Sequence, residues 1–254
     1  MPRYPSLRRR SLLLFLLIPT LLLAEDHAVE HVNTLFQVST LDALSLGIYQ
    51  GALSFRELER QGDFGVGTFD SLDGEMIALD GRFYQVRSDG TVSRVAGDAT
   101  TPFAAVTTFK PDWMLTSNQS LSYAQISALI DQMLPSKNLF YAVKIHGMFT
   151  GLTARSVPRQ FLPFPPLATA ISQQTLFPFH NISGTLVGFR SPAFVKGINQ
   201  PGYHLHFISD DQHSGGHALS FQTMQVVIEI AVIRQHSTFL PDNQPFLSAP
   251  LPLP

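Results

Sequence analysis

The sequence predicts an α+β fold in two domains, built mainly from antiparallel or mixed β-sheets with a few helices. Three observations predict it. Short runs of strand-forming residues are separated by Asp-Gly pairs, which are the strongest two-residue signal for a β-hairpin. Only a few segments carry the signals of a helix start. In the second half of the chain, long apolar runs alternate with stretches rich in glycine and proline.

Length and composition are those of a chain that can bury a hydrophobic core. It has 254 residues, of which 44% are apolar and 14% are charged. The formal net charge of −2 gives no electrostatic reason to expect a nucleic-acid partner. The absence of cysteine excludes disulfides, thiolate metal ligands, cysteine nucleophiles and a lipoprotein anchor.

The amino terminus resembles a secretory signal. Four arginines precede an apolar run at residues 11–24, and two acidic residues follow it. The run is shorter than the roughly 20 residues that span a bilayer, and Pro19 interrupts it. We therefore expect residues 1–24 to be a signal peptide, leaving a secreted or periplasmic protein with no stable membrane span. Leu22 and Ala24 form an imperfect cleavage site, so an uncleaved anchor is the alternative.

The first predicted domain, residues 25–135, contains two predicted helical segments, at residues 32–61 and 122–134. Each contains a capping box, in which a serine and a Glu or Gln three residues later satisfy each other's backbone N–H groups. The boxes are Ser54 with Glu57 and Ser122 with Gln125. Gly62 and Pro135 are natural stops for the two segments.

Between these two segments the sequence predicts an antiparallel meander of short strands. Asp73-Gly74 and Asp80-Gly81 are each expected to form a two-residue hairpin. The glycines at positions 62, 65 and 67 lead into a strand instead of opening a helix, so they do not form a dinucleotide-binding loop. The expected strands are residues 65–69, 75–79, 82–86, 91–95 and 104–109.

The second predicted domain, residues 136–240, is rich in strands. Residues 157–179 contain five prolines, too many for a regular element, and are expected to form an ordered loop that crosses the sheet. The proline-rich tail, residues 241–254, is expected to be extended. The predicted strands are residues 140–150, 186–189, 203–209 and 218–233.

Three of the nine histidines form a pattern that is typical of a metal site. Residues two apart on a strand point to the same face about 7 Å apart, so His204 and His206 can converge on one ion. The polar segment 210–216 predicts a turn that brings the chain back antiparallel and presents His217 to that face. Three neutral imidazoles without a thiolate favour zinc, with one position left open for water or substrate. This places the predicted metal site on strands of the carboxyl-terminal half.

The other histidines are weaker candidates. A lone histidine on a strand is more often a hydrogen-bonded core or surface residue than a ligand. His213 competes with His217 for the third position but lies at the flexible tip of the predicted turn. The remaining candidates have no comparable partner in the sequence and are expected to be structural; they are His146, His180 and His236.

Two charged residues are candidates for catalysis. Glu75 directly follows a predicted turn and begins an apolar strand, where burial would raise its pKa and suit it to proton transfer. Arg155 follows the strand that ends near Thr150, at a loop edge where its guanidinium could bind a carboxylate with two hydrogen bonds. Taken alone, each pattern is also that of a solvated surface charge.

Five separated segments carry a further signal. They are Gly62–Phe69, Leu72–Ile77, Gly147–Phe149 with Arg155, Gly184–Phe189, and Gly202–Asp211 with Gly215–His217. Together they resemble the corresponding segments of bacterial α-acetolactate decarboxylases. The resemblance covers roughly residues 32–234. It is most specific in the last segment, where the histidine spacing and the surrounding residues match together.

The resemblance implies a two-domain α/β protein, commonly a homodimer, in which His204, His206 and His217 hold zinc. It further implies that Arg155 binds the substrate carboxylate and that Glu75 takes part in proton transfer. Thr68, in the first matching segment, is a predicted substrate-binding residue.

The implied reaction is the decarboxylation of 2-acetolactate, a 2-hydroxy-3-keto acid, to (R)-acetoin and CO2, in the formation of acetoin and butanediol. No organic cofactor is implied. In the family an acidic residue of the carboxyl-terminal tail also enters the site, but no Asp or Glu follows Asp242 here. Either Asp242, another acid or water takes that place, or the tail is altered and activity is reduced.

Two other functions fit parts of the pattern. A cupin-like metal enzyme also uses His-x-His on a strand, but it predicts a carboxylate ligand a few residues later and a β-barrel without the two helices. A secreted zinc-binding module, in which the metal only holds the sheet together, would need a fourth protein ligand. The agreement of five separated segments favours the decarboxylase.

Overall fold

A computed structural model describes residues 33–251, and these residues belong to one compact unit. The predicted signal peptide, residues 1–24, lies outside the described residues. Within the described part of the chain, no helix is long and apolar enough to cross a membrane. The predicted α+β class is confirmed, since β-sheets dominate and the helices are few and short.

The larger sheet has seven strands in the order β14-β1-β8-β3-β4-β5-β6. β1 pairs with β14 in parallel, and the other neighbours are antiparallel. Its strands are β1 (Thr34–Val38), β3 (Phe64–Thr68), β4 (Glu75–Leu79), β5 (Arg82–Val86), β6 (Val92–Arg94), β8 (Ala104–Thr107) and β14 (Gln235–Phe239).

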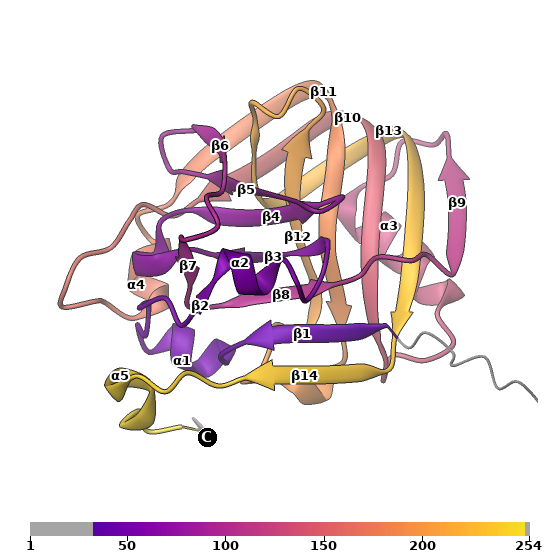
Figure 1. The fold of residues 1–254 in the computed structure, drawn as a ribbon. Coiled ribbons are helices and arrows are strands. Elements are labelled where there is room, and N and C mark those ends of the chain that lie inside the picture. Colours follow the sequence, from indigo (N-terminus) through magenta and orange to yellow (C-terminus); the bar gives the residue numbers. More distant parts are fainter. Residues whose placement is uncertain (1–32, 252–254) are drawn as a thin grey trace, which may run out of the picture. The chain divides into compact units, whose positions relative to one another are not determined.

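The second sheet has five strands, and its long strand β10 pairs with both β11 and β13. Because β12 bridges β11 and β13, these four strands close into a ring, and β9 extends it along β13. The strands are β9 (Trp113–Ser117), β10 (Phe140–Ser156), β11 (Thr175–Ser191), β12 (Gly202–Ser209) and β13 (Gly215–Ile233). They run across the strands of the first sheet (Figure 1).

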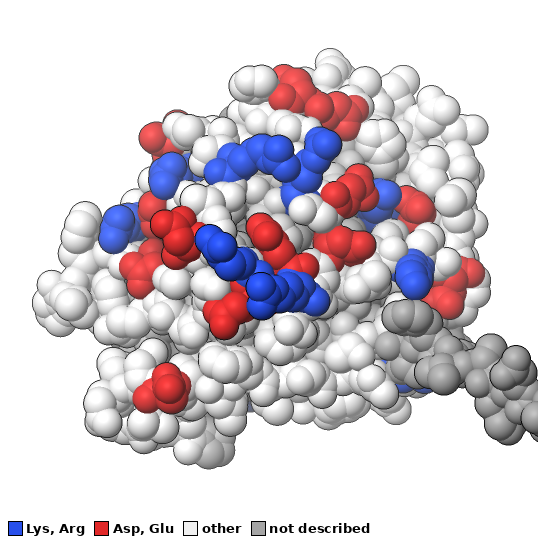
Figure 2. All heavy atoms as spheres, viewed as in Figure 1, with Lys and Arg blue, Asp and Glu red and all other residues white. Residues whose placement is uncertain are grey.

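One face of the larger sheet packs against the second sheet, because alternate residues of its strands are apolar and buried there. The opposite face is covered by short elements that bury Phe55 and Leu58 against Met76 and Phe83. A second cluster places α3 against the ring through Ile126 and Ile130. On the face shown in Figure 2, basic and acidic side chains are interspersed.

The remaining elements are short. The helices are α1 (Leu41–Ser45), α2 (Phe55–Leu58), α3 (Tyr123–Met133), α4 (Leu167–Ile171) and α5 (Gln244–Leu247). Two 3-10 turns, Asp70–Leu72 and Ala193–Val195, and the two-stranded pair β2 (Leu53–Ser54) with β7 (Thr100–Thr101) complete the chain.

Several local predictions are confirmed. Both capping boxes form, and the second starts α3 close to its predicted bounds. β4 and β5 have their predicted bounds. Asp80 and Gly81 join them in a two-residue hairpin, with φ of 50° and 73°, in the left-handed region that such a turn requires.

Asp73-Gly74 does not form a two-residue hairpin, so that prediction is wrong. Thr68 pairs with Glu75, and the connection between β3 and β4 is therefore the whole segment 69–74. The longer loop turns Phe69 and Leu72 into apolar clusters, where each is 4% exposed. A two-residue hairpin would forgo that burial.

The single helical segment predicted at residues 32–61 is also wrong. Thr34–Val38 forms β1 instead, held between β8 and β14, with Leu35 and Val38 fully buried. Positive φ angles at Ser39 and Gly47 interrupt any helix, so only α1 and α2 remain. Strand pairing across the sheet therefore outweighs the local helical pattern.

The prediction of a loop for residues 157–179 is wrong at its end, because α4 forms and β11 begins at Thr175. Pro178 is tolerated in β11 since β12 pairs with β11 only from Gly184 onward, which leaves an open edge beside the proline. The tail is not wholly extended, because Asn243 caps the short helix α5. The division into domains at residue 135 stays a prediction. β14, which follows residue 135, belongs to the seven-stranded sheet, and β9, which precedes it, belongs to the five-stranded sheet.

Candidate active site

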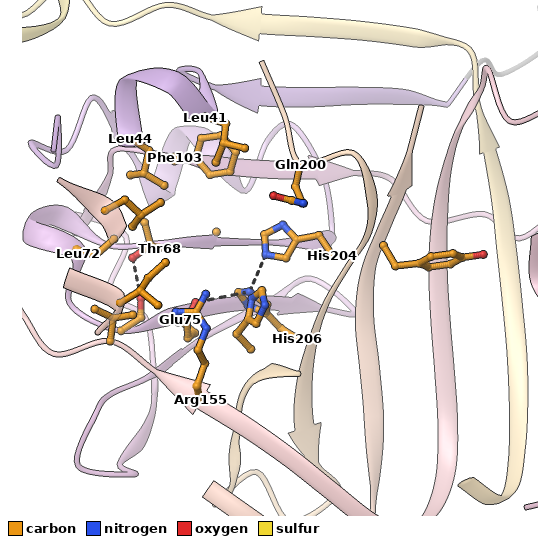
Figure 3. A pocket seen from close by; sticks show the side chains of 17 residues that line it. Leu41, Leu44, Thr68, Leu72, Glu75, Phe103, Arg155, Gln200, His204 and His206 are labelled. Atoms are coloured by element: carbon orange, nitrogen blue, oxygen red, sulfur yellow. Dashed lines mark hydrogen bonds and ion pairs between the residues drawn. The ribbon is translucent and has the colours of Figure 1, made fainter. Parts of the chain in front are cut away.

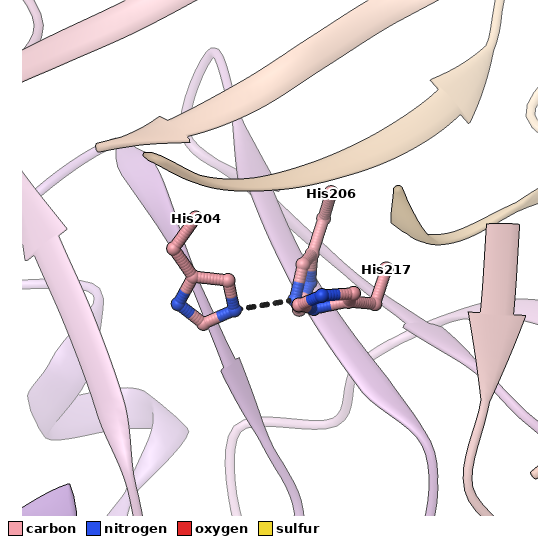
Figure 4. Close-up of side chains that lie close together, drawn as sticks. All are labelled: His204, His206 and His217. Atoms are coloured by element: carbon pink, nitrogen blue, oxygen red, sulfur yellow. Dashed lines mark hydrogen bonds between the residues drawn. The ribbon is translucent and has the colours of Figure 1, made fainter. Parts of the chain in front are cut away.

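Three imidazoles meet where β12 and β13 form a hairpin. His204 and His206 lie on β12, and His206 is directly opposite His217 on β13. Their ring centroids lie 5.0–5.1 Å apart, and the Nε2 atoms of His204 and His206 are separated by 3.2 Å (Figure 4). The sequence prediction that these residues share one face is therefore met by the geometry.

The geometry suits a metal ion. One potential ligand atom from each of the three rings lies within 4.8 Å of the other two. His206 Nδ1 lies 2.8 Å from the Met76 carbonyl oxygen, to which it donates as the Nδ1–H tautomer, leaving Nε2 free as a ligand. Two ligands about 2.0–2.1 Å from a tetrahedral zinc ion are separated by about 3.3 Å, close to the spacing found here.

Burial keeps the three rings in the neutral form that binds metals. It lowers the pKa of His204 to about 4, with Arg155 adding to the effect. Burial first, and the neighbouring histidines second, hold the pKa of His206 and of His217 well below the usual value of 6.5. Neutral imidazole is therefore available without deprotonation at neutral pH.

Glu75 is the first residue of β4 and is 7% exposed. Its carboxylate lies between two of the predicted partners: Oε1 is 3.7 Å from Arg155 Nη1, and Oε2 is 3.6 Å from His206 Nε2. Burial raises the pKa of Glu75 to about 7, and the Arg155 charge opposes that shift. A carboxyl group with a pKa near neutrality can both donate and accept a proton.

Arg155 lies within β10 and not at the predicted loop edge, which corrects that detail. β10 continues past Thr150 to Ser156 because β11 and β13 pair with it on both sides. Arg155 is the pairing partner of His217. Its largely buried guanidinium lies 3.7 Å from Glu75 and lines the same cavity as the three imidazoles.

Thr68 lines the same cavity, opposite Glu75 in the pairing of β3 with β4. Its hydroxyl donates a hydrogen bond of 2.7 Å to the Gly74 carbonyl. The hydroxyl hydrogen of this predicted substrate-binding residue is thus bound to the loop that leads into Glu75, and the oxygen remains available as an acceptor.

These residues line one cavity of about 290 Å³, whose polar end carries the imidazoles, Glu75 and Arg155 (Figure 3). The rest of its wall is largely apolar, with side chains from α1, α4 and the adjoining loops. That apolar lining comprises Leu41, Leu44, Leu72, Phe103, Val157, Leu167 and Ile171.

Sequence reasoning missed the apolar lining of the cavity, including Leu41 and Leu44 of α1, and it also missed Gln200. The two leucines fit the helical segment predicted there, and nothing local in the sequence separates a cavity wall from a core position. Figure 3 shows Gln200 beside His204. Among residues 33–251, none after His217 lines the cavity, so Asp242 contributes no side chain to it.

The competing histidines lie elsewhere. His213 is exposed on the turn, with Nδ1 3.9 Å from Asp211 Oδ1. His146 contacts Thr185 and Asp210, and His236 contacts Gln37. In the part of the chain that the structure describes, the cluster that could hold a metal contains His204, His206 and His217 only.

Comparison with known proteins shows which protein family the chain matches. The family model described as alpha-acetolactate decarboxylase matches residues 35–253. The chain is 53% identical over 190 residues to the alpha-acetolactate decarboxylase of Methanosarcina mazei, covering 75% of this chain and 66% of that protein. It is 44% identical over 227 residues to that of Methylococcus capsulatus, covering 89% and 85%.

A solved structure is also similar. The alpha-acetolactate decarboxylase of Bacillus subtilis strain 168 superimposes with a TM-score of 0.85 at 39% sequence identity. The match covers 87% of this chain and 94% of the other. The two proteins therefore share their fold over most of the chain.

Proposed function

The chain belongs to the alpha-acetolactate decarboxylase family, and on that premise we propose that it converts 2-acetolactate to (R)-acetoin and CO2 with zinc held by three histidines. One observation carries the proposal. A single cavity joins three neutral imidazoles to the Glu75–Arg155 pair. The imidazoles can bind a metal ion, Arg155 can bind a carboxylate, and Glu75 can transfer a proton.

The substrate has a ketone β to its carboxylate, so the bond to CO2 breaks when its electron pair can move toward the ketone oxygen. Negative charge then develops on an enediolate, and catalysis requires that this charge be stabilised. A zinc ion bound by His204, His206 and His217 would supply a Lewis acid beside that charge.

Arg155 binds and orients the substrate carboxylate in this proposal. A guanidinium presents parallel N–H donors that match the two oxygens of a carboxylate. Because Arg155 extends from β10 directly opposite His217, the carboxylate would be held next to the metal-binding end of the cavity. The bond that breaks is thereby fixed relative to the imidazoles.

Glu75 supplies the proton that replaces CO2. Its raised pKa keeps a protonated fraction near neutral pH. The protonated carboxyl donates to the planar enediolate carbon, and solvent then restores the proton. Since Glu75 lies on one strand at one side of the cavity, the proton would reach one face only and give one enantiomer.

The apolar wall suits the two methyl groups of 2-acetolactate. Leu72, Phe103 and Val157 lie in the cavity lining, and each is largely buried in the apolar cluster behind it. Such a wall excludes water and strengthens the electrostatic interactions at the polar end. It leaves the carboxylate, hydroxyl and ketone to the charged groups.

Acetoin formation from racemic 2-acetolactate tests the proposal. The purified chain is assayed as isolated, after treatment with a chelator, and after zinc is added back, with the product resolved on a chiral column. Turnover that is lost with the chelator and restored by zinc, giving (R)-acetoin, supports it. A folded, zinc-loaded protein without turnover contradicts it and reopens the cupin-like and zinc-binding alternatives.

Export and assembly are part of the proposal. Residues 1–24 would direct the chain out of the cytoplasm and be removed, and the exported protein would be a homodimer. Mass spectrometry of the protein from the expressing cells and from their medium gives the molecular mass of the chain. That mass shows whether and where the chain is cleaved. Light scattering of the purified protein gives the number of chains in the assembly.

A further inference from the structure

β5 lies next to the segments that carry the two charged residues of the cavity but does not itself line the cavity. Of the described side chains that line the cavity, none comes from β5. Besides the pairing of β4 with β5, two side-chain hydrogen bonds join this strand to the segments that carry Glu75 and Arg155. Gln85 Nε2 donates to the Asp73 carbonyl over 2.6 Å, and Ser156 Oγ donates to the Val86 carbonyl over 2.8 Å.

The loop before Glu75 needs such support. Ser71 and Leu72 have φ angles of 61° and 55°, in the left-handed region that non-glycine residues rarely adopt. Strained backbone of this kind persists only where the surrounding structure fixes it. Gly74 lies so close to β5 that an added Cβ would be 2.3 Å from the Val86 carbonyl oxygen.

Gln85 reaches this loop from the side of the sheet opposite the cavity. It pairs with Met76, and side chains on paired residues lie on the same face, whereas the neighbouring Glu75 lies on the other. Gln85 is 8% exposed and donates to a residue two positions before Glu75. Its side chain therefore lies on the face opposite the Glu75 carboxylate and acts on Glu75 through the backbone.

Ser156 ties the other charged residue to the same strand. It directly follows Arg155 at the end of β10 and is fully buried. Its hydrogen bond to Val86 crosses from the second sheet to the first. The backbone of Arg155 is thereby fixed relative to the strand that also supports the loop before Glu75.

We propose that Gln85 and Ser156 are positioning residues that set the placement of Glu75 and Arg155, Gln85 through the loop 69–74 and Ser156 through the end of β10. The inference rests on the proposed decarboxylation for its kinetic consequences. The two residues act on different steps, since Glu75 delivers a proton after the bond breaks and Arg155 holds the carboxylate from the start.

Two variants test it against a matched control. Gln85→Met keeps the unbranched shape of glutamine but removes the donor, and Ser156→Ala removes the hydroxyl. Thr107→Val is the control, because Thr107 is a buried residue of the same sheet whose hydroxyl donates to the Thr34 carbonyl and which does not line the cavity. Each variant is measured for kcat, KM, enantiomeric excess of acetoin, zinc content and melting temperature.

We expect one variant to change mainly kcat and the other to change mainly KM. Gln85→Met lowers kcat roughly tenfold and reduces the enantiomeric excess, with KM changed less than about twofold. Ser156→Ala raises KM roughly tenfold without lowering kcat, because Arg155 binds the carboxylate of the intact substrate, and the negative charge of that group moves toward the ketone oxygen as the bond breaks. Thr107→Val changes neither constant, and all three retain zinc.

A uniform loss would overturn the inference. If Gln85→Met and Ser156→Ala alter kcat and KM only as much as Thr107→Val does, or in equal proportion, the two side chains serve stability alone. Gln85→Leu is the second variant if Gln85→Met does not fold. If neither variant gives folded protein, Gln85 is needed for stability, and its proposed positioning role is overturned.

Hydrogen exchange separates this inference from the proposed function. If the wild-type chain does not decarboxylate 2-acetolactate, the function fails, but the support of the loop can still be measured. Amide exchange in residues 70–75 that is at least tenfold faster in Gln85→Met than in Thr107→Val supports the role of Gln85. Equal exchange in the two variants overturns it.

Discussion

Arg155 lies directly opposite His217 in the pairing of β10 with β13. The residue proposed to bind the substrate carboxylate and one of the proposed zinc ligands therefore come from adjacent positions in one sheet. The approach of the two strands depends on Gly216, where an added Cβ would lie 2.5 Å from the Arg155 carbonyl oxygen. The pairing of the two strands thus fixes the distance between Arg155 and His217 before any ligand binds.

Replacing Arg155 by Gln is expected to raise KM for 2-acetolactate about a hundredfold, equivalent to roughly 3 kcal/mol. The loss arises because the substrate carboxylate no longer meets a charged donor. Arg155→Lys should recover only part of it, since a lysine cannot present two parallel N–H donors. Steady-state kinetics of the zinc-loaded variants measure both effects.

Arg159→Gln is the control for this substitution. Arg159 is an exposed arginine whose nearest acidic partner, Asp70, lies 3.9 Å away, and it does not line the cavity. Its loss should leave KM within about twofold of the wild-type value. A similar rise in KM for both variants would show that general positive charge, and not Arg155 itself, attracts the substrate.

His206→Ala is expected to lose zinc and activity together. Removal of this ring leaves two imidazoles of the cluster and also removes the hydrogen bond to the Met76 carbonyl. Zinc content by atomic absorption should fall well below one ion per chain after dialysis, and turnover should fall at least about a hundredfold. His213→Ala, on the exposed turn, should keep both; loss of zinc there would reassign the third ligand.

Glu75→Gln is expected to keep zinc and lose turnover. Glutamine preserves the shape of the side chain but cannot deliver a proton, and general acid catalysis contributes roughly 100- to 10,000-fold to rates. Parallel measurement of zinc content and kcat distinguishes this result from that of His206→Ala. Full turnover in the zinc-loaded variant would remove Glu75 from the mechanism.

The same substitution should make the metal-free protein more stable at alkaline pH. Burial raises the pKa of Glu75 to about 7 from an ordinary value of 4.5, so the folded state binds the proton more tightly than the unfolded state. Stability from this group is present below pH 4.5 and is lost as pH rises toward 7. At pH 8 the ionised carboxylate costs roughly 3 kcal/mol, which Glu75→Gln avoids.

Urea unfolding of the chelated proteins at pH 5 and pH 8 measures this effect. Glu75→Gln and the wild type should have similar midpoints at pH 5, and the variant should have the higher midpoint at pH 8. Equal stability at both values would mean that the carboxylate is adequately solvated or paired with Arg155 in the folded state.

Local signals predict part of this structure. The Ser122–Gln125 capping box marks the start of α3, and the Asp80-Gly81 turn marks the hairpin between β4 and β5. The spacing of His204 and His206 predicts that they share a face, because strand geometry alone places residues two apart together. Each of these features depends on a few residues that are adjacent in the sequence.

Features that depend on distant pairing could not be predicted in this way. Thr34–Val38 has a helical pattern but forms a strand because β8 and β14 lie on either side of it. The end of β10 that carries Arg155 is a strand because β11 and β13 pair with it. Leu41 becomes a cavity residue only through the position of α1 in the folded molecule.

Gly216→Ala is expected to disrupt the site more than an alanine at another left-handed glycine. Gly216 has a φ of 136°, and a Cβ there would meet the Arg155 backbone, so β13 must move away from β10. The movement would separate His217 from His206 and shift Arg155. Zinc affinity should fall at least about tenfold, and the free energy of unfolding by roughly 2–4 kcal/mol.

Gly81→Ala provides the comparison, because Gly81 has a φ of 73° in the β4–β5 hairpin and nothing lies within 4 Å of the added Cβ. Only backbone strain of about 1 kcal/mol is expected there, with zinc affinity unchanged. Calorimetric zinc titration and urea unfolding of both variants separate strain from steric contact. If Gly216→Ala loses no more stability or zinc affinity than Gly81→Ala, β10 and β13 can part without displacing His217, and their close approach does not fix the imidazole cluster.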